Sequence, residues 1–200
     1  MTFAQILRLP RTQIAHHRGT FLAALLLIAA AVVYPSDTDS YRYEGAQDAL
    51  IQGVEHYGRH VNTVLALAVP IVLRDWVGLK QLAVATVAGI VATHGPKRLL
   101  NDVWIGDTRL GQRPRGPDSN HNMPSGHSAL ASAVIWFLGR RYSWWWALIT
   151  VPITLLTMYA RVMQNAHTIS AVIAGCLIGL LVTALFVTHR RAARPSGPLG

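Results

Sequence analysis

Long apolar runs alternate with short polar connections along most of this chain. Uncharged segments recur at residues 19–36, 61–73, 81–96, 119–139, 142–160 and 162–188. A helix needs about 20 apolar residues to cross a hydrocarbon layer of about 30 Å, and most of these segments approach that length. The pattern predicts an all-α integral membrane protein, folded as a six-helix bundle. We place the spans at about residues 19–36, 61–76, 79–96, 122–139, 142–160 and 167–188.

The second span is the shortest of the six. Only residues 61–73 are free of charge, fewer than the roughly 20 residues that a full crossing needs. Arg74 therefore has to extend its side chain toward the headgroups, and His60 has to lie in the interface. Just before this span, residues 44–60 place apolar side chains at helical spacing among charged ones. That stretch fits either a short helix lying on the outer membrane interface or an ordered loop.

The charges of the connections are distributed unequally between the two predicted sides of the bundle. Counted over the whole sequence, the side with both termini carries ten basic and one acidic side chain, and the other side carries eight of each. Lys and Arg favour the cytoplasmic side of a membrane protein. We therefore expect both termini in the cytoplasm. The connections before the fourth and sixth spans then share the opposite, outer face.

Composition agrees with a membrane protein and argues against other classes. The chain has 200 residues, 52% of them hydrophobic, and its formal net charge is +9. Nucleic-acid-binding proteins are also basic, but here the basic residues form no continuous stripe and long uncharged runs separate them. We expect neither DNA nor RNA as a partner. The single cysteine, Cys176, lies inside an apolar run and can form no intrachain disulfide.

The fourth span begins with the run Pro124-Ser125-Gly126-His127. Free N–H groups at a helix N-terminus bind anions, and Gly126 lets the backbone approach a ligand closely. Ser125 adds a hydroxyl donor, while His127 is placed to pass a proton to a leaving oxygen. The same four residues also fit an ordinary helix start with an interfacial histidine, so the motif needs support from other parts of the chain.

That support comes from charged side chains at other helix ends. Arg113 and Arg161 lie close to apolar segments, where an uncompensated arginine is costly, and the guanidinium group matches phosphate oxygens in pairs. Lys97, just after the third span, either adds a point charge or anchors its helix at the membrane surface. His167 follows Arg161 by six residues. A neutral imidazole there can attack phosphorus and carry a phosphoryl group, although a single histidine at a helix end is more often structural.

These motifs resemble the three-part signature of the type 2 phosphatidic acid phosphatase superfamily. The three parts are Arg113-Pro114, the run Pro124-Ser125-Gly126-His127, and Arg161 with His167. The resemblance covers residues 97 to about 175 and implies one transmembrane phosphatase domain over residues 1–200. It implies that His167 is the phosphoryl-accepting nucleophile and His127 the general acid, with Arg161 beside them. It also implies that no metal or other cofactor is needed and that the phosphate is held by Lys97, Arg113, Ser125, Gly126 and Arg161.

Three positions depart from the family pattern. The family usually has lysine seven residues before the arginine of its first motif, where this chain has Gly106, whereas Lys97 stands sixteen residues before Arg113. Lys97 therefore reaches the site only if the residues between them loop out. Ala160 stands where the third motif usually has serine. Ala171 stands where an aspartate normally orients the nucleophilic histidine.

The missing carboxylate needs a substitute that fixes the tautomer of His167. Asp102, Asp107 and Asp118 lie in the same predicted outer connection, and we expect one of them to take this role. Nearby hydroxyl groups or a backbone carbonyl group are weaker alternatives. The competing interpretation is that the aspartates only balance neighbouring arginines.

A metal site is another interpretation of the histidines. The candidate ligands are His94, His121, His127, His167 and Asp118. None of them has the i, i+4 or short spacing of a zinc site, and His56 and His60, which do have it, lack a third ligand. We expect no metal ion.

The resemblance implies a membrane lipid phosphatase, and we consider three kinds of function. The first is hydrolysis of a phosphomonoester or diphosphate on a lipid headgroup, at the periplasmic face of a bacterial inner membrane, through a phosphohistidine. Lipid A 1-phosphate is the preferred substrate of this kind. The second is action on undecaprenyl diphosphate or phosphatidylglycerol phosphate, or phosphoryl transfer to another lipid. The third, of another class, is a phospholipid-binding or transport protein that has lost its chemistry.

Overall fold

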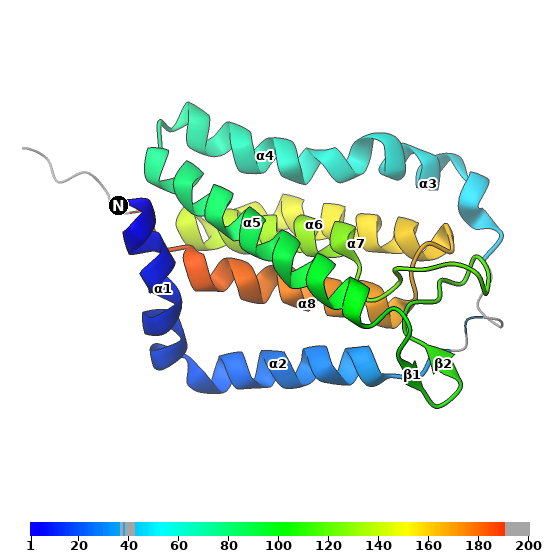
Figure 1. Cartoon of the computed structure of the whole chain (residues 1–200). Coiled ribbons are helices and arrows are strands. Elements are labelled where there is room, and N and C mark those ends of the chain that lie inside the picture. Colours follow the sequence, from blue (N-terminus) through cyan, green and yellow to red (C-terminus); the bar gives the residue numbers. More distant parts are fainter. Residues whose placement is uncertain (37, 39–42, 191–200) are drawn as a thin grey trace, which may run out of the picture.

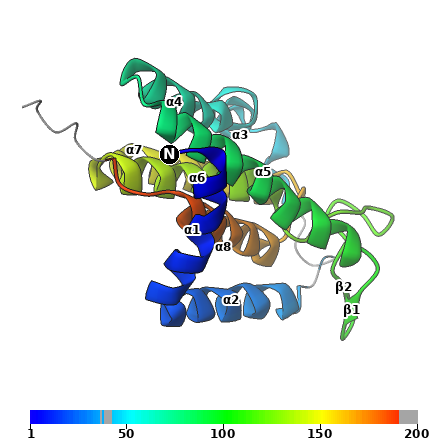
Figure 2. The same cartoon turned by 60° about the vertical axis from the view of Figure 1, so that its left-hand side comes forward.

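The computed structural model describes residues 1–36, 38 and 43–190, and it is built almost entirely from helices. The charge count above also includes residues outside this description, namely Asp37, Asp39, Arg42, Arg191 and Arg194. Six helices pack against one another, and α1 (Phe3–His16) lies at one end of them, as Figures 1 and 2 show. They are α2 (Arg18–Val33), α4 (Arg59–Val72), α5 (Trp76–Leu99), α6 (Gly126–Arg141), α7 (Ala147–Met163) and α8 (Ile169–Phe186).

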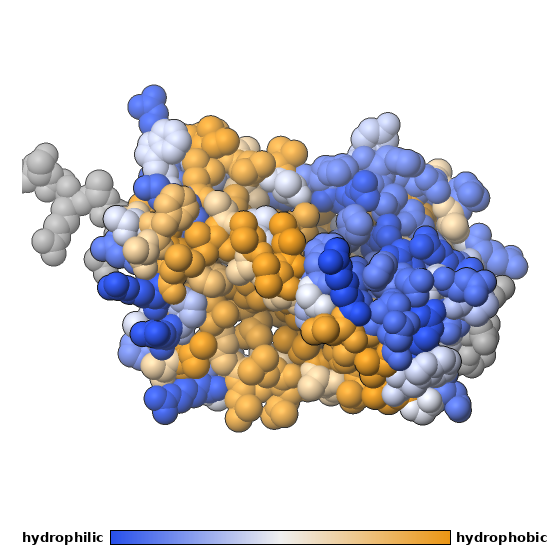
Figure 3. Space-filling view, in the orientation of Figure 1, coloured by the Kyte–Doolittle hydropathy of each residue, from blue (hydrophilic) through white to orange (hydrophobic). Residues whose placement is uncertain are grey.

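Three described helices are long and apolar enough to cross a membrane. They are Trp76–Leu99, Ile169–Phe186, and Trp144–Met163, which joins the short helix η3 (Trp144–Trp146) to α7. The pair α1 and α2, bent by 95°, makes a fourth if it is counted as one span. In Figure 3 apolar side chains form a band across the middle of the visible face, between polar ends. The helical class is thus confirmed, while the crossing of all six helices and the side of the termini stay predictions.

The stretch before the second span is helical and continues the axis of that span. After η1 (Gly45–Gln47) come α3 (Ala49–Gly53), the π-helical η2 (Val54–Gly58) and α4, which form one rod in Figure 1. α3 and η2 pack against α7, and Ile51 and Val54 form a small buried cluster with Ala160 at this contact. These residues are therefore helical and pack on the helix bundle, so the ordered-loop alternative is wrong, while their place at the outer membrane interface stays a prediction.

α1 is an element that the apolar pattern did not predict. Thr2 and Gln5 form a reciprocal cap, in which the hydroxyl group of Thr2 accepts from the N–H of Gln5 and the side chain of Gln5 accepts from the N–H of Thr2. α1 contacts α5 and α8, and its Ile6 is fully buried. The helix lies across the end of the bundle opposite a small hairpin, formed by β1 (Trp104–Ile105) and β2 (Thr108–Arg109) in Figure 1.

α6 and α8 pack with their backbones in direct contact. A Cβ added at Gly175 would lie 2.2 Å from the carbonyl oxygen of Ser125, and one at Gly179 would lie 2.1 Å from that of Ala129. The backbone N–H of Ser125 donates to the carbonyl oxygen of Ala171 at 2.9 Å. Ala171, Gly175 and Gly179 recur every four residues, so they share one face of α8, as small residues do where membrane helices approach closely. This contact fixes the start of α6 against the start of α8.

A buried ion pair holds the other end of the bundle. The carboxylate of Asp75, just before α5, accepts two hydrogen bonds from Arg141 at 2.5 and 2.6 Å and one from Tyr142 at 2.9 Å. Burial raises the pKa of Asp75, but the hydrogen bonds from Arg141, Gly78 and Tyr142 outweigh it and lower that pKa to about 2. Gln81 accepts from Nη1 of Arg141 at 3.0 Å. The start of α5 is thereby tied to the end of α6.

We expect Gly175→Ala to destabilise the protein by about 1–3 kcal/mol, because the new methyl group meets a backbone oxygen that cannot move aside. Thermal unfolding in detergent will show this as a lower midpoint. Gly89→Ala in α5 is the matched control, since no atom lies within 4 Å of a Cβ added there. Equal midpoints for the two variants would contradict the close packing of α6 and α8.

Candidate active site

Two helix starts meet at the end of the bundle that carries the hairpin. Oγ of Ser125 caps α6 by accepting from the N–H of Ser128, and Oγ1 of Thr168 caps α8 by accepting from the N–H of Ala171. Asn122 joins the two starts. Its Oδ1 accepts from the N–H of Thr168 at 3.0 Å, and its Nδ2 donates to Oγ1 of Thr168 at 3.1 Å. Hydrogen bonds therefore hold the connection before α6 against Thr168, the N-cap residue of α8.

His167 lies in the connection between α7 and α8, outside the span of α8, and only 2% of it is exposed. Its Nδ1 lies 2.7 Å from the backbone carbonyl oxygen of Asn122. A carbonyl oxygen only accepts hydrogen bonds, so Nδ1 carries the proton. This tautomer follows from the hydrogen-bond partner. Nε2 is therefore the nitrogen that keeps its lone pair, as the predicted attack on phosphorus requires.

The group that orients His167 is not one of the three aspartates that we expected. The side chain of Asp102 is 85% exposed and lies 3.6 Å from Arg109. Within the described residues, neither Asp102, Asp107 nor Asp118 forms a hydrogen bond with His167. The carbonyl group of Asn122, one of the weaker alternatives, occupies that place.

Ala171, which stands at the position of the family's aspartate, makes apolar contacts in this chain. Ala171 is fully buried and packs with Leu110 and Met123. A carboxylate there would lose hydration within an apolar cluster unless it reached His167. The alanine therefore agrees with a site in which the backbone already supplies the acceptor.

Burial and nearby positive charges both act on His167. Burial, together with the charges of Lys97, Arg161 and Arg113, holds the pKa of His167 well below its usual range, against the opposing hydrogen bond to Asn122. A lowered pKa keeps the imidazole neutral at neutral pH, which is the form needed for nucleophilic attack. The charges of three predicted phosphate-binding residues thus converge on the predicted nucleophile.

Both arginines of the site have a free donor. The Nε–H groups of Arg113 and Arg161 are buried and have no hydrogen-bond partner in the part of the chain that the structure describes. Nη1 of Arg161 is held by Glu55 at 3.0 Å and Gln164 at 3.1 Å, and Nη2 of Arg113 donates to the carbonyl oxygen of His121 at 3.2 Å. An unpaired buried donor costs about 1–3 kcal/mol. An anion that accepts from both guanidinium groups would remove that cost.

Lys97 reaches this end of the bundle because the residues after it turn back as a hairpin. β1 (Trp104–Ile105) pairs antiparallel with β2 (Thr108–Arg109). Gly106 occupies the turn with φ of 55°, a backbone conformation that disfavours the side chain that the family usually has there. Lys97, in the last turn of α5, is close enough for its charge to act on His167. The hairpin is thus the loop that the long separation between Lys97 and Arg113 in the sequence required.

The start of α6 is open on the side where a ligand can bind. No atom lies within 4 Å of a Cβ added at Gly126. Nε2 of His127 lies 3.3 Å from Nη1 of Arg59. Ser125 is fully buried, and its Oγ accepts from both the N–H and the hydroxyl group of Ser128, which leaves its own hydroxyl hydrogen as a donor. These groups meet the requirements of the phosphate site, but their roles stay predictions.

Three residues that contact the site were missed from the sequence. Asn122 acts through its backbone carbonyl group, and no side-chain pattern reports that contact. Glu55 and Arg59 come from the rod formed by η2 and α4, and they contact Arg161 and His127. The only signal in the sequence was an acid and a base four residues apart, the spacing of an ordinary helix-surface pair.

A pocket of about 1260 Å³ lies between α2, the hairpin and the start of α8. His167 is part of its wall, and apolar side chains such as Ala30, Ile105 and Ile173 form much of the rest. Among the described residues, no three His, Cys, Asp or Glu side chains are placed to hold a metal ion.

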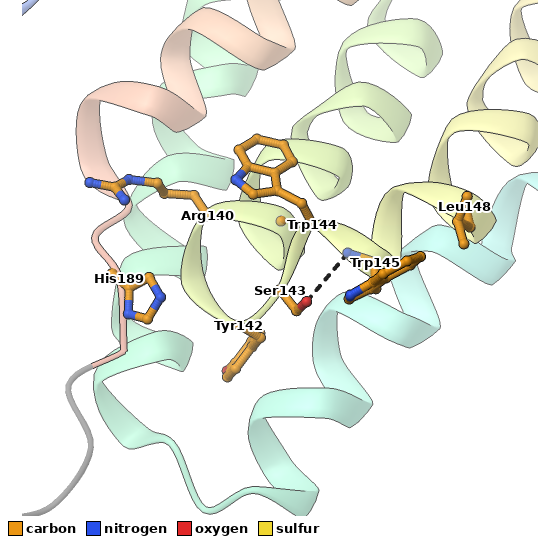
Figure 4. A pocket seen from close by; sticks show the side chains of 8 residues that line it. Arg140, Tyr142, Ser143, Trp144, Trp145, Leu148 and His189 are labelled. Atoms are coloured by element: carbon orange, nitrogen blue, oxygen red, sulfur yellow. Dashed lines mark hydrogen bonds between the residues drawn. The ribbon is translucent and has the colours of Figure 1, made fainter.

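A second pocket, of about 580 Å³, lies by the turn that follows α6, at the end of the bundle away from His167 (Figure 4). Its wall includes Arg140, Trp144, Trp145 and His189. Trp144 and Trp145 are exposed, and exposed tryptophans are typical of a membrane interface. None of the predicted site residues lies there.

The fold and the site together define a class, a helical membrane phosphatase with two histidines and a cluster of cationic side chains at its helix ends. The family model described as PAP2 superfamily matches residues 15–195, so the chain belongs to the PAP2 superfamily and is a phosphatase. The resemblance seen in the sequence is thereby confirmed.

Curated relatives agree with this assignment. A lipid A 1-phosphatase of Helicobacter pylori strain 26695 is 46% identical over 140 residues, 68% of this chain and 71% of the relative. The lipid A 1-phosphatase of strain J99 is 48% identical over 136 residues, 68% of this chain and 70% of the relative. A lipid A 4'-phosphatase of strain J99 is 29% identical over 179 residues, 88% of this chain and 85% of the relative. No solved structure matches significantly.

We expect Asn122→Ala to lower kcat with little change in KM, because the side chain that locks Thr168, and with it His167, is removed. Each lost buried hydrogen bond costs about 1–3 kcal/mol, so a decrease of about ten- to a hundredfold is expected. Asn120→Ala, in the same connection but exposed, is the control. Equal kcat values for the two variants would show that Asn122 does not orient the histidine.

The lowered pKa of His167 predicts the acid limb of the pH profile. Because the group has to be neutral, kcat/KM should fall only when the pH drops through that lowered pKa, well below the usual value of about 6.5. Lys97→Gln removes one of the charges responsible and should move the acid limb to higher pH. A wild-type limb at or above pH 6.5 would be incompatible with the buried, cation-rich site.

Proposed function

We propose that this protein removes the 1-phosphate of lipid A at the periplasmic face of a bacterial inner membrane, through a phosphohistidine at His167. One observation supports this chemistry: the charges of Arg113 and Arg161 act on His167, whose Nε2 keeps its lone pair, and both arginines have a buried Nε–H group without a partner among the described residues. A nucleophile and unpaired cationic donors in one place favour a phosphoryl group as the reacting species.

In the first step, Nε2 of His167 attacks phosphorus. An N–P bond forms while the P–O bond to the lipid breaks, and His127 gives its proton to the leaving oxygen. Arg113, Arg161 and Lys97 balance the charge on the non-bridging oxygens. The N–H groups at the start of α6 and the hydroxyl group of Ser125 add further donors to the same oxygens.

In the second step, water replaces the histidine. Water attacks phosphorus, its proton passes to Nε2 of His127, and the N–P bond breaks. Inorganic phosphate leaves, and His167 returns to its neutral form with the proton on Nδ1. The carbonyl group of Asn122 supports both steps, because it holds the same tautomer before and after the transfer.

A lipid substrate is supported by the surroundings of His167. The pocket beside it is lined by apolar residues of α2 and α8. No residue of α2 is buried, and Leu22, Leu25 and Leu26 are more than half exposed, which suits contact with acyl chains. The identity of 46–48% to the two lipid A 1-phosphatases, against 29% to the 4'-phosphatase, favours the 1-phosphate.

The periplasmic location is supported by charge. The site lies at the end of the bundle away from α1 and from Arg140 and Arg141 (Figure 1). Basic residues near the termini and at the α6–α7 turn favour the cytoplasm for that end. The opposite end, with His127 and His167, would then face the periplasm.

We expect His167→Ala and His127→Ala to abolish phosphate release from purified lipid A while both proteins still insert in membranes. His94→Ala, an exposed histidine of α5, is the control and should retain activity. Mass spectrometry of the lipid distinguishes loss of the 1-phosphate from loss of the 4'-phosphate. A base-stable, acid-labile label from radioactive substrate should be trapped on the wild type and be absent from His167→Ala.

The other candidate functions give different results in the same assay. Release from undecaprenyl diphosphate or phosphatidylglycerol phosphate, but not from lipid A, would replace the substrate. Appearance of the phosphoryl group on a second lipid would indicate a transferase. Lipid binding without release from any member of the panel, or release unchanged in His167→Ala, would overturn the proposed mechanism.

A further inference from the structure

One carboxylate lies within the cluster of cationic side chains. Oε1 of Glu55 accepts from Nη1 of Arg161 at 3.0 Å and from Nη1 of Arg59 at 2.5 Å. The side chain of Glu55 is 17% exposed and that of Arg161 is 12% exposed. Both contacts are therefore largely removed from solvent, where charge-assisted hydrogen bonds are strong. The family signature described above does not include Glu55 or Arg59.

Arg59 extends this contact to the predicted general acid. Its Nη1, besides donating to Glu55, lies 3.3 Å from Nε2 of His127. A guanidinium group only donates, so Nε2 of His127 is the acceptor in the resting protein, and this nitrogen has to take up a proton before His127 acts as the acid. A continuous chain of hydrogen bonds thus runs from Arg161 through Glu55 and Arg59 to His127.

The local backbone explains why Glu55 reaches the site. Glu55 lies in the π-helical segment η2, and such segments are frequent at functional sites. Ile51 and Val54, on the same rod, pack against Ala160, which precedes Arg161 and is 1% exposed. The small side chain at position 160, where the family usually has serine, gives the rod an apolar surface to pack on. The contact places Glu55 against Arg161.

Glu55 holds one edge of Arg161 and leaves the other edge free. Nη1 of Arg161 is occupied by Glu55 and Gln164, whereas its Nε–H has no partner among the described residues. A guanidinium group fixed on one side presents its remaining donors in a defined direction. Less side-chain freedom is then lost when a phosphate binds.

We propose that Glu55 and Arg59 are positioning residues, which aim Arg161 at the phosphate and set the pH range over which His127 donates its proton. The inference rests on the proposed function, since it assigns His127 as the acid of that reaction. Glu55 favours the protonated form of His127 by its negative charge, and Arg59 disfavours that form by its positive charge. The two residues therefore act on His127 in opposite directions.

The charged groups that face His127 come from four elements of the structure. They are Arg161 of α7, Glu55 of η2, Arg59 of α4 and Lys97 of α5. Glu55 is the one negative charge of this set. Its removal leaves three cations around a ring that has to carry a proton, which is why the effect on pH dependence should be large.

The test compares the alkaline limb of the pH profile of kcat/KM, where a general acid loses its proton. Glu55→Gln, which keeps an oxygen acceptor for the arginines, should move that limb to lower pH by about one unit. Arg59→Gln should move it to higher pH by a similar amount, and the double variant should return toward the wild type. Glu44→Gln and Arg98→Gln, exposed residues of the same charges, are the controls and should leave the limb unchanged.

Titration of the His127 ring by NMR in the resting protein gives a second readout that needs no turnover. It should show the same opposite displacements in Glu55→Gln and Arg59→Gln. Unchanged or equal displacements in both variants would overturn the inference, because a purely structural role lowers activity without opposite shifts. If the wild type hydrolyses no phosphate ester at all, the proposed function fails, and the NMR titration still decides the roles of Glu55 and Arg59.

Discussion

The site depends on the direct backbone contact between α6 and α8. In hydrocarbon a backbone N–H has to find its partner within the protein, and that of Ser125 finds the carbonyl oxygen of Ala171. The contact is possible because Gly175 and Gly179 leave no side chain between the helices. It brings two helix N-termini together at one end of the bundle. The proposed nucleophile and the proposed anion-binding turn are neighbours for that reason, although about forty residues separate them in the sequence.

The same contact accounts for the absent aspartate. Once the two helix starts are joined, Asn122 lies beside His167 and offers a carbonyl oxygen to Nδ1. A neutral acceptor fixes the tautomer as a carboxylate would, but it adds no negative charge next to His167. The acidic group that contacts the site's cations is instead Glu55, which bonds to Arg161 and, through Arg59, reaches His127. Tautomer control and charge balance are thereby divided between two residues.

Much of the helical architecture and most residues of the candidate site could be predicted from the sequence, and the remainder could not for identifiable reasons. The apolar runs predicted helices, and Gly126, His127 and Arg161 stood out by residue type and position. α1 was missed because its polar face breaks the apolar pattern. Glu55 and Arg161 are 106 residues apart, and their contact depends on how the rod packs on α7, which local spacing does not encode. The role of Asn122 was invisible because its contact with His167 uses the backbone.

Three arginines of the bundle show how hydrogen bonding separates structural from functional groups. Arg141 is buried, yet Asp75, Gln81 and the carbonyl oxygen of Thr188 accept from it, so its charge is fully compensated within the protein. Arg113 and Arg161 are also partly withdrawn from solvent, but each keeps a buried donor without a partner in the described chain. A membrane protein gains nothing in stability from such a donor, because its desolvation is not compensated. Its retention at the end with His167 is explained if the missing acceptor is the phosphate of a substrate.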